Sequence, residues 1–358
     1  MAGGVRVPLV MVMFLLSGCV ADSPPPPDPR TAVEQALDAL ADQTAVAYQV
    51  SAVPSGGLPP DPRLGTGPQT PLARLTVTRN GLAQGVLPIR GEQVGIVRVG
   101  GSVFLRAHAD YWREQGMPAE RAGEYGARWV RVDGGVPLLD PRLLDPAAVA
   151  RTLRERLPAQ ARPVRATLPD GTAVFEVNGL RVTAVAPHRV ADVAPELLGQ
   201  PVEDSFGAGV ISVDGLSGGG LADLRSSLDG AISGLGQPFV AGPVVAASVT
   251  ANELSCDPDG LCTDTVQVRH QLVGGASDTG VRLVLTAAVN SADLGTRSCV
   301  QEVVVAVNEP AAIVCAVRFE LPRKAGYTRV IAQPAVTAEP VAIVDIDRLR
   351  REVATELG

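Results

Sequence analysis

Residues 72–81 read LARLTVTRNG, and their period of two decides the fold class of the region around them. Leu75 and Val77 alternate with threonines, which is typical of a strand with one apolar face. Asn80-Gly81 then predicts a tight hairpin turn, because both residue types tolerate a positive φ. An antiparallel sheet is therefore expected to begin here.

The same turn chemistry recurs further along the chain. Gly100-Gly101 separates two apolar runs, and Asn178-Gly179 separates two more,. Residues 46–53 form another expected strand and precede a proline- and glycine-rich loop at 54–71. Together these segments predict one curved antiparallel sheet over residues 31–190.

Start signals for helices are interleaved with these strands. Thr31 with Glu34 three residues on is a capping box, so a helix is expected to open the region,. Asp110 and Pro118 are expected to begin two short helices, and Asp145-Pro146 to begin a longer one. The region is therefore predicted to be an α+β domain.

Valine-rich runs separated by turn clusters fill residues 243–322 and predict a small β-sandwich. The five runs are Val244–Thr250, Thr265–Leu272, Val281–Val289, Cys299–Val307 and Ala311–Phe319. Residues 191–242 are interpreted as a linker with an amphipathic helix, and residues 323–358 as a segment ending in a helix capped by Asp345.

Four cysteines in the last third of the chain predict two disulfides in an oxidising compartment,. Four cysteines allow three pairings. We favour Cys256 with Cys262 across a turn, and Cys299 with Cys315 between neighbouring strands.

No metal or cofactor is predicted. His108, His188 and His270 are scattered singly, and no cysteine pair is spaced as CxxC,. The segment CDPDGLCTD at 256–264 is interpreted as an Asp-Gly turn, since Gly260 comes too early for a calcium loop and no glutamate closes it. The aspartates that such a loop would use are Asp257, Asp259 and Asp264.

The amino-terminal residues carry the pattern of an exported, lipid-modified protein. Arg6 supplies positive charge, and the apolar stretch at 7–16 spans only about 15 Å, too short for a bilayer core of roughly 30 Å,. Leu16-Ser17-Gly18-Cys19 resembles a bacterial lipobox, in which the Cys19 thiol accepts a diacylglyceryl group. We expect residues 1–18 to be a signal peptide and residues 19–30 a proline-rich tether.

This reading places the protein outside the cytoplasm, anchored to the cell membrane through Cys19. The alternatives are an exported protein in which Cys19 has no role, and a cytoplasmic protein with an apolar start. The net charge of -7, without a basic stripe, disfavours nucleic-acid binding,. Lys324 is the only lysine among 31 basic residues, a bias that indicates a GC-rich genome such as that of an actinobacterium.

Gly215-Leu216-Ser217-Gly218-Gly219 matches the G-x-S-x-G pattern of a hydrolase nucleophile,. A nucleophile elbow needs a parallel α/β sheet and then an acid and a histidine in order, and only His270 follows Ser217. We therefore favour a glycine-rich connection before a helix, and no enzymatic activity is predicted.

A resemblance follows from residues 101–133, GSVFLRAHADYWREQG…AGEYGARWVRVD. An apolar strand, a short aromatic helix and Gly-x-x-Trp-Val-x-Val resemble the actinobacterial lipoproteins of the LppX/LprAFG type over residues 31–190. The resemblance implies a half-barrel sheet with helices across its concave face, enclosing an apolar cavity for lipid or lipoglycan. Trp112 and Trp129 either line such a cavity or anchor the core. Members of that group often end where this chain continues.

The residues favour two non-enzymatic functions. In the first, a lipid-anchored cell-envelope protein binds or carries a lipid or lipoglycan in an apolar cavity of its amino-terminal domain. In the alternative, the protein is an envelope interaction or structural module that docks a protein partner through the β-sandwich.

Overall fold

The computed structural model describes residues 28–50, 73–89, 92–126, 128–133, 141–206, 209–322 and 326–358. The expected signal peptide, Cys19, nearly all of the tether and the loop at 54–71 lie outside these ranges. The described chain is mixed α+β, as predicted, and consists mostly of strands in two largely antiparallel sheets, with seven α-helices.

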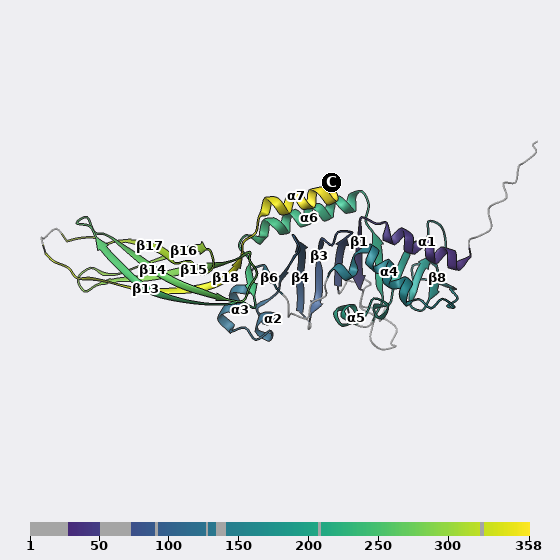
Figure 1. Ribbon diagram of the computed structural model, residues 1–358, viewed down its shortest axis with the longest axis horizontal. Coiled ribbons are helices and arrows are strands. Elements are labelled where there is room, and N and C mark those ends of the chain that lie inside the picture. Colours follow the sequence, from purple (N-terminus) through teal and green to yellow (C-terminus); the bar gives the residue numbers. More distant parts are fainter. Residues whose placement is uncertain are drawn as a thin grey trace, which may run out of the picture.

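Eleven strands and the helices that cover them form a part that we call the platform (Figure 1). The strand order is β6-β5-β4-β3-β2-β1-β11-β10-β9-β8-β7, and neighbouring strands are antiparallel. The bounds are β1 Ala45–Val50, β2 Ala73–Thr78, β3 Ala83–Ile89, β4 Glu92–Val99, β5 Ser102–Arg106, β6 Val130–Val132, β7 Val164–Thr167, β8 Ala173–Val177, β9 Leu180–Thr183, β10 Val190–Val193 and β11 Ile211–Gly215.

The prediction that residues 191–242 form a linker is wrong, because they supply strands to this sheet. β11 lies between β1 and β10, with Gly215 opposite Val46 and Ile211 opposite Val50. Ile211 and Val213 are buried and Ser212 is half-buried, which is the period-two pattern of a strand,. The flanking glycines obscured this short pattern in the sequence.

Two of the three predicted hairpin turns have the expected backbone. Gly100 and Gly101 have φ of 57° and 78°, and Asn178 and Gly179 have φ of 48° and 84°,. At the remaining turn only Gly81 has a positive φ, of 82°. The prediction for its neighbour Asn80 is wrong, because the β2–β3 loop is longer than two residues and needs only one left-handed position.

Seven α-helices accompany these strands in the described residues. They are α1 Pro29–Ala41, α2 Ala109–Glu114, α3 Ala119–Tyr125, α4 Pro146–Arg156, α5 Gln200–Phe206, α6 Gly219–Leu235 and α7 Ile346–Leu357. Asp145 caps α4 by accepting from the Ala148 N–H at 2.8 Å, and Asp345 caps α7 by accepting from the Arg348 N–H at 2.9 Å. Both caps were predicted.

Two other helix starts differ from the prediction. α1 begins at Pro29, so the expected capping residue Thr31 lies inside its first turn. Proline suits the first helical position because its missing N–H has no intrahelical acceptor there. α2 begins after His108, and Asp110 therefore sits in the first turn without capping it.

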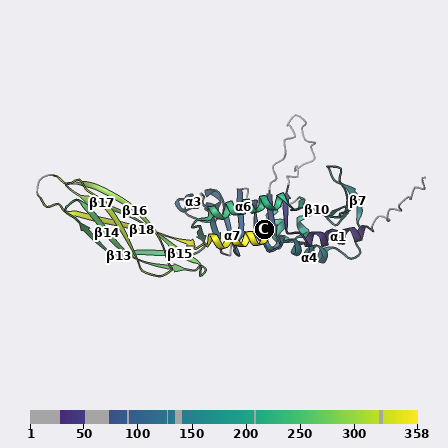
Figure 2. The same ribbon diagram turned by 90° about the horizontal axis from the view of Figure 1, so that it is seen from above.

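Helices cover both faces of the platform sheet. On one face a large core includes Leu37 of α1, Trp112 of α2 and Leu153 of α4. On the other face α6 and α7 run side by side across the strands (Figure 2) and bury Leu228 and Val353 in a second core. The amphipathic helices predicted before residue 242 and at the end of the chain thus both pack on the platform.

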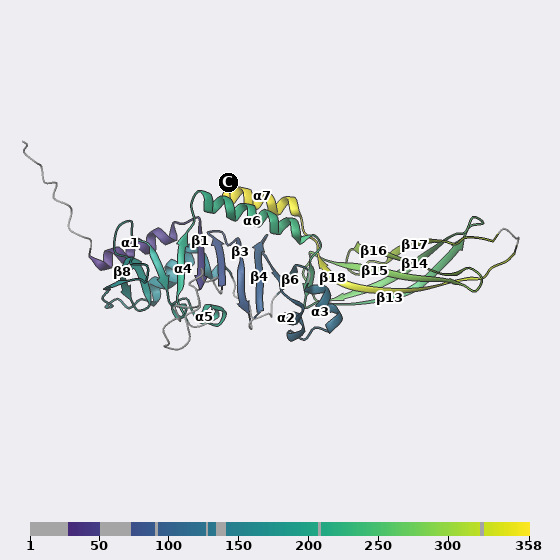
Figure 3. The ribbon, with the colours of Figure 1, turned by 180° about the vertical axis from the view of Figure 1, so that it is seen from behind.

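Six long strands form a second part that we call the arm, which extends away from the platform (Figures 1 and 3). They are β13 Val244–Cys256, β14 Leu261–Val273, β15 Thr279–Ser291, β16 Gly295–Val305, β17 Ala311–Arg318 and β18 Val330–Ala342. β13, β14 and β17 form one sheet. β16, β15 and β18 are the strands at one end of the larger sheet that also contains the platform strands. The two groups share a core that contains Val266, Leu283 and Ile313.

β18 was not predicted, because its alternating residues were assigned to a carboxyl-terminal segment. It pairs along its whole length with β15, with Val336 opposite Leu285. Its pattern includes Pro334 and Pro340, residues that usually mark the edge or end of a strand,. The arm therefore extends beyond residue 322, the predicted end of the β region.

Both predicted disulfides are present. Cys256 and Cys262 face each other across the β13–β14 hairpin with Cα atoms 4.0 Å apart. Cys299 of β16 and Cys315 of β17 are joined with Cα atoms 6.1 Å apart. These two strands belong to different sheets, so the second bridge ties the two layers of the arm together.

The platform and arm meet at β12 (Phe239–Ala241), which pairs parallel with β6 and antiparallel with β18. Phe239 stacks on Tyr125 with ring centroids 4.5 Å apart, and Tyr125 meets Trp112 edge-on. Buried Arg131 of β6 reaches Asp278 and Thr279 near the start of β15, each at 2.8 Å. This joint makes one continuous sheet through both parts.

Candidate functional site

A cavity of about 740 Å³ lies between the second half of α6 and the platform strands beneath it. This volume falls within the range typical of small-molecule sites. The lining consists of Gln84, Arg106, Arg128, Trp129, Ser227, Gly230, Ala231, Gly234, Leu235, Gly236 and Gln237. It combines apolar surface with cationic and amide side chains and contains no carboxylate.

Trp129 forms one wall of the cavity. A Cβ atom at Gly234 of α6 would lie 3.6 Å from the Trp129 indole nitrogen, and one at Gly95 of β4 would lie 3.7 Å from its Cη2 atom. The indole is therefore held between two glycines, one on the helix and one on the sheet. Of the two tryptophans considered in the sequence, Trp129 lines this cavity, whereas Trp112 is buried in the opposite core.

Two arginines supply the charge of the cavity. Arg106 ends β5 and is exposed; among the described residues it makes no ion pair or hydrogen bond. Arg128 lies over the Phe239 ring at 5.2 Å. Its electrostatic neighbour Glu302 is engaged by Arg282 at 2.6 and 2.8 Å.

Amide and hydroxyl groups line the cavity beside these charges. The Gln84 Nε2 atom of β3 donates to the Ser227 hydroxyl of α6 at 2.6 Å. The Oε1 atom of Gln84 is buried without a hydrogen-bond partner in the described residues. A buried acceptor without a donor is costly, so a ligand hydroxyl here would satisfy an existing need.

Gly230 and Gly234 of α6 both line this cavity. A Cβ atom placed on Gly230 would meet nothing within 4 Å. Gly230 is exposed and lies on the far side of α6 from its buried leucines, whereas an added Cβ at Gly234 points toward the Trp129 indole, so Gly234 is the α6 glycine at which a larger side chain would enter the cavity.

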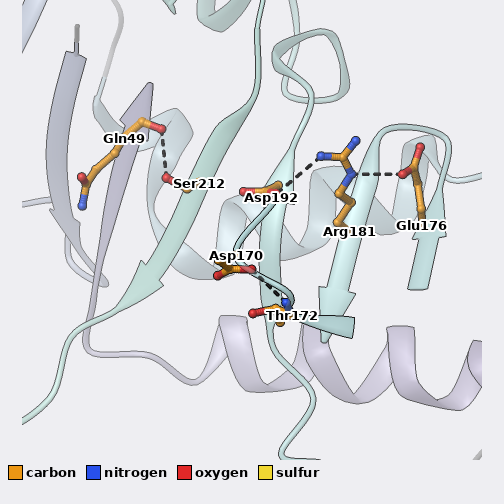
Figure 4. Close-up of polar contacts among 7 residues, drawn as sticks. All are labelled: Gln49, Asp170, Thr172, Glu176, Arg181, Asp192 and Ser212. Atoms are coloured by element: carbon orange, nitrogen blue, oxygen red, sulfur yellow. Dashed lines mark hydrogen bonds and ion pairs between the residues drawn. The ribbon is translucent and has the colours of Figure 1, made fainter. Parts of the chain in front are cut away.

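A second cavity, of about 410 Å³, lies where α1 meets β9, β10 and β11, and it has the opposite charge. Asp170, Asp192 and Asp214 line it. Burial raises the pKa of Asp192, while Arg181, at 3.7 Å, opposes that increase. The Thr172 N–H donates to Asp170 at 2.9 Å and lowers the pKa of that carboxyl (Figure 4).

Ser217 lines the rim of this acidic cavity and is exposed. It follows β11, which is antiparallel to both of its neighbours, whereas a nucleophile elbow ends a strand of a parallel sheet,. The described residues lining the cavity include no histidine. The local geometry therefore gives Ser217 neither the strand context nor the base of a hydrolase triad.

The remaining candidate residues are not brought together. His108 is exposed beside Asp110, whereas His188 and His270 are buried and lie against backbone carbonyls at 2.8 and 3.0 Å. Gly260 turns the β13–β14 hairpin with φ of 86°.

The aspartates of the CDPDGLCTD segment also have separate roles. Asp257 belongs to the hairpin turn, and Asp259 pairs with Arg318 at 3.0 Å. Asp264 is fully buried on β14 opposite Cys315, and burial raises the pKa of its carboxyl. Across the described ranges no cluster of three or more His, Cys, Asp or Glu residues is arranged to hold a metal ion.

No family model matches the chain, and neither does any curated protein. Among the described helices, none is both long and apolar enough to cross a bilayer. The cavity lined by Arg106, Arg128 and Trp129 was not predicted as a unit. Its residues come from four separate segments of the chain. Of these residues, only Trp129 was predicted as a possible cavity residue from the sequence.

Proposed function

We propose that this protein is a lipid-anchored, extracytoplasmic envelope protein without enzymatic activity that binds or carries a lipid or lipoglycan. The cavity beneath α6 is the observation that carries the proposal. It has the size of a ligand site, and Trp129, Ala231 and Leu235 give it an apolar wall,. The lipobox-like segment ending at Cys19 supplies the proposed anchor, and the resemblance to LppX/LprAFG-type lipoproteins supports the same class.

Binding of this kind needs no catalytic residue. Apolar surface removed from water contributes about 25 cal/mol per Å², so a partly buried acyl chain can be retained by transfer alone. Trp129 offers a large, rigid surface at little entropic cost, since the two adjacent glycines already fix its position,.

The proposal includes two finer features of the fold. The platform sheet would curve as a half-barrel beneath its helices, and the arm would be a small β-sandwich braced by its disulfides. The shared core of the arm layers supports the second feature.

Native mass spectrometry tests lipid binding directly. The form beginning at residue 20 keeps every described helix and strand and is expected to copurify with one lipid when made in an actinobacterial host. Gly234→Leu places its side chain beside the Trp129 indole inside the cavity and should abolish that added mass. Gly123→Leu is the control for a glycine-to-leucine change in a helix, because Gly123 is an exposed position of α3 whose added Cβ meets nothing within 4 Å.

Two results would contradict the proposal. One is a lipid-free protein from every preparation, and the other is equal lipid content in the Gly234→Leu and Gly123→Leu variants. Membrane fractionation of Cys19→Ser tests the anchor separately, since loss of acylation should release the protein from the membrane fraction.

A protein-docking role for the arm is the second candidate. It is favoured by valines on the outer surfaces of the arm, of which Val300 of β16 and Val314 of β17 are 63% and 54% exposed,. The two valines lie on the outer faces of different layers of the arm, so whichever of Val300→Asp and Val314→Asp changes the docking face should remove a crosslinked partner in envelope extracts without changing lipid content. A partner retained by both variants would exclude both outer faces.

A further inference from the structure

We propose that the cavity beneath α6 selects amphiphiles with an anionic head group, such as a phosphate, and that Arg106 and Arg128 are the selecting residues. This inference rests on the proposed lipid-binding function and specifies its ligand class. A chain with a net charge of -7 repels anions at long range,. Two arginines in a cavity without carboxylates create a local region of positive charge that attracts anions.

Arg106 is available to a ligand. Arg106 pairs opposite Gly95 in the β4–β5 register, and Gly95 lies beside the Trp129 indole. The side chain of Arg106 makes no ion pair or hydrogen bond among the described residues. Arginine presents several N–H donors in one plane, which suits two oxygens of a phosphate or carboxylate. A head group bound to Arg106 therefore lies next to the apolar wall.

Arg128 is adjacent to Trp129 in the sequence and also lines this cavity, and its guanidinium, which rests over Phe239 of the opposite core, would have to turn toward the ligand to supply a second cation. The Phe239 ring beneath its guanidinium limits the directions in which it can point,. The carboxylate that influences it, Glu302, accepts two hydrogen bonds from Arg282. Arg128 thus keeps donors for an anion even though acidic residues lie nearby.

The rest of the lining explains why the ligand is an amphiphile and not a free anion. Trp129, Ala231 and Leu235 offer surface that an inorganic ion cannot use. The acidic cavity beside Ser217 has no comparable cationic pair, so it does not compete for the same ligand.

Isothermal titration calorimetry on the form beginning at residue 20 tests this selection. The probes are dodecyl phosphate below its micellar concentration, neutral dodecyl maltoside at the same concentration, and inorganic phosphate. Each of Arg106→Gln and Arg128→Gln should weaken dodecyl phosphate binding about tenfold, which is about 1.4 kcal/mol, because each removes charge-assisted hydrogen bonds to the anion. The double variant should lose about a hundredfold, and dodecyl maltoside binding should change by less than about twofold.

Arg151→Gln is the matched control, because Arg151 is exposed on α4 and lines none of the cavities described above. Equal binding of both amphiphiles, unchanged in the arginine variants, would overturn anion selection and leave lipid binding intact. Binding of neither amphiphile would overturn both proposals. Inorganic phosphate binding as tightly as dodecyl phosphate would assign the cavity to a free anion and overturn the amphiphile class.

Discussion

The two disulfides of the arm should contribute unequally to its stability, and the pair of double variants Cys299→Ala/Cys315→Ala and Cys256→Ala/Cys262→Ala tests this. Their sequence separations are 16 and 6 residues. Loop-closure entropy then gives about 3 kcal/mol for the first bridge and about 2 kcal/mol for the second at 25 °C.

Topology acts in the same direction. Cys256 and Cys262 are already opposite each other in one hairpin, whose turn is held by the Asp257 N–H donating to the Leu261 carbonyl at 2.8 Å. The Cys299–Cys315 bridge instead joins two sheets that have no hydrogen-bonded strand pair between them at that point. Each double variant removes two sulfur atoms. The difference between their free energies of unfolding therefore isolates the effect of which strands the disulfide joins.

Urea unfolding, followed by circular dichroism in oxidising buffer, measures the effect. We expect the cross-layer variant to lose about 1 kcal/mol more than the hairpin variant, and to become sensitive to proteolysis within the arm first. Equal losses, or a larger loss for the hairpin variant, would refute the reasoning that the Cys299–Cys315 bridge holds the layers together.

Three further predictions concern buried charge and the anchor. Asp264→Asn should stabilise the protein at pH 7 by about 1–3 kcal/mol, because burial disfavours the charged carboxylate more than its neighbour Asn252 stabilises it,. Burial raises the folded-state pKa of the Asp264 carboxyl. The stability of the unsubstituted protein is therefore retained below the unfolded pKa, near 4, and lost as the pH rises through the folded pKa. In urea unfolding, the advantage of Asp264→Asn should accordingly shrink toward pH 4. Arg131→Met should cost about 2 kcal/mol in the same assay, a moderate loss because its partner Asp278 is 53% exposed and regains water,; no loss would show that the joint is held by its strands alone. Cys19→Ser should abolish incorporation of radiolabelled palmitate, and unchanged labelling would exclude acylation at that sulfur.

Local signals in the sequence predicted local structure well. The caps at Asp145 and Asp345, the turn at Asn178-Gly179 and both disulfides are present because each depends on residues close in sequence or on a small set of pairings. The period of two located the strands of the amino-terminal region for the same reason.

Long-range pairing was harder to predict. β11 is a five-residue strand that enters the sheet between β1 and β10, and nothing in Ile211–Gly215 specifies those partners. β18 carries two prolines, which disguised a strand of 13 residues,. The predicted end of the β region at residue 322 therefore falls short of β18, whereas its predicted start at residue 243 directly precedes β13.

The cavity depends on the same long-range arrangement. Arg106, Trp129 and Gly234 are far apart in the sequence and meet only because α6 returns across the platform. Glycines at 95 and 234 are informative only once the indole that they flank is known. No spacing rule could have connected them.

Photocrosslinking provides the most direct test of a ligand site beneath α6. A dodecyl phosphate analogue with a diazirine in its alkyl chain would be irradiated with the form beginning at residue 20, and the labelled peptides would be mapped by mass spectrometry. The account predicts labelling within residues 227–237 and at Trp129, lost in Gly234→Leu and retained in Gly123→Leu. Labelling confined to the arm or to the opposite face of the platform, unaffected by Gly234→Leu, would contradict it.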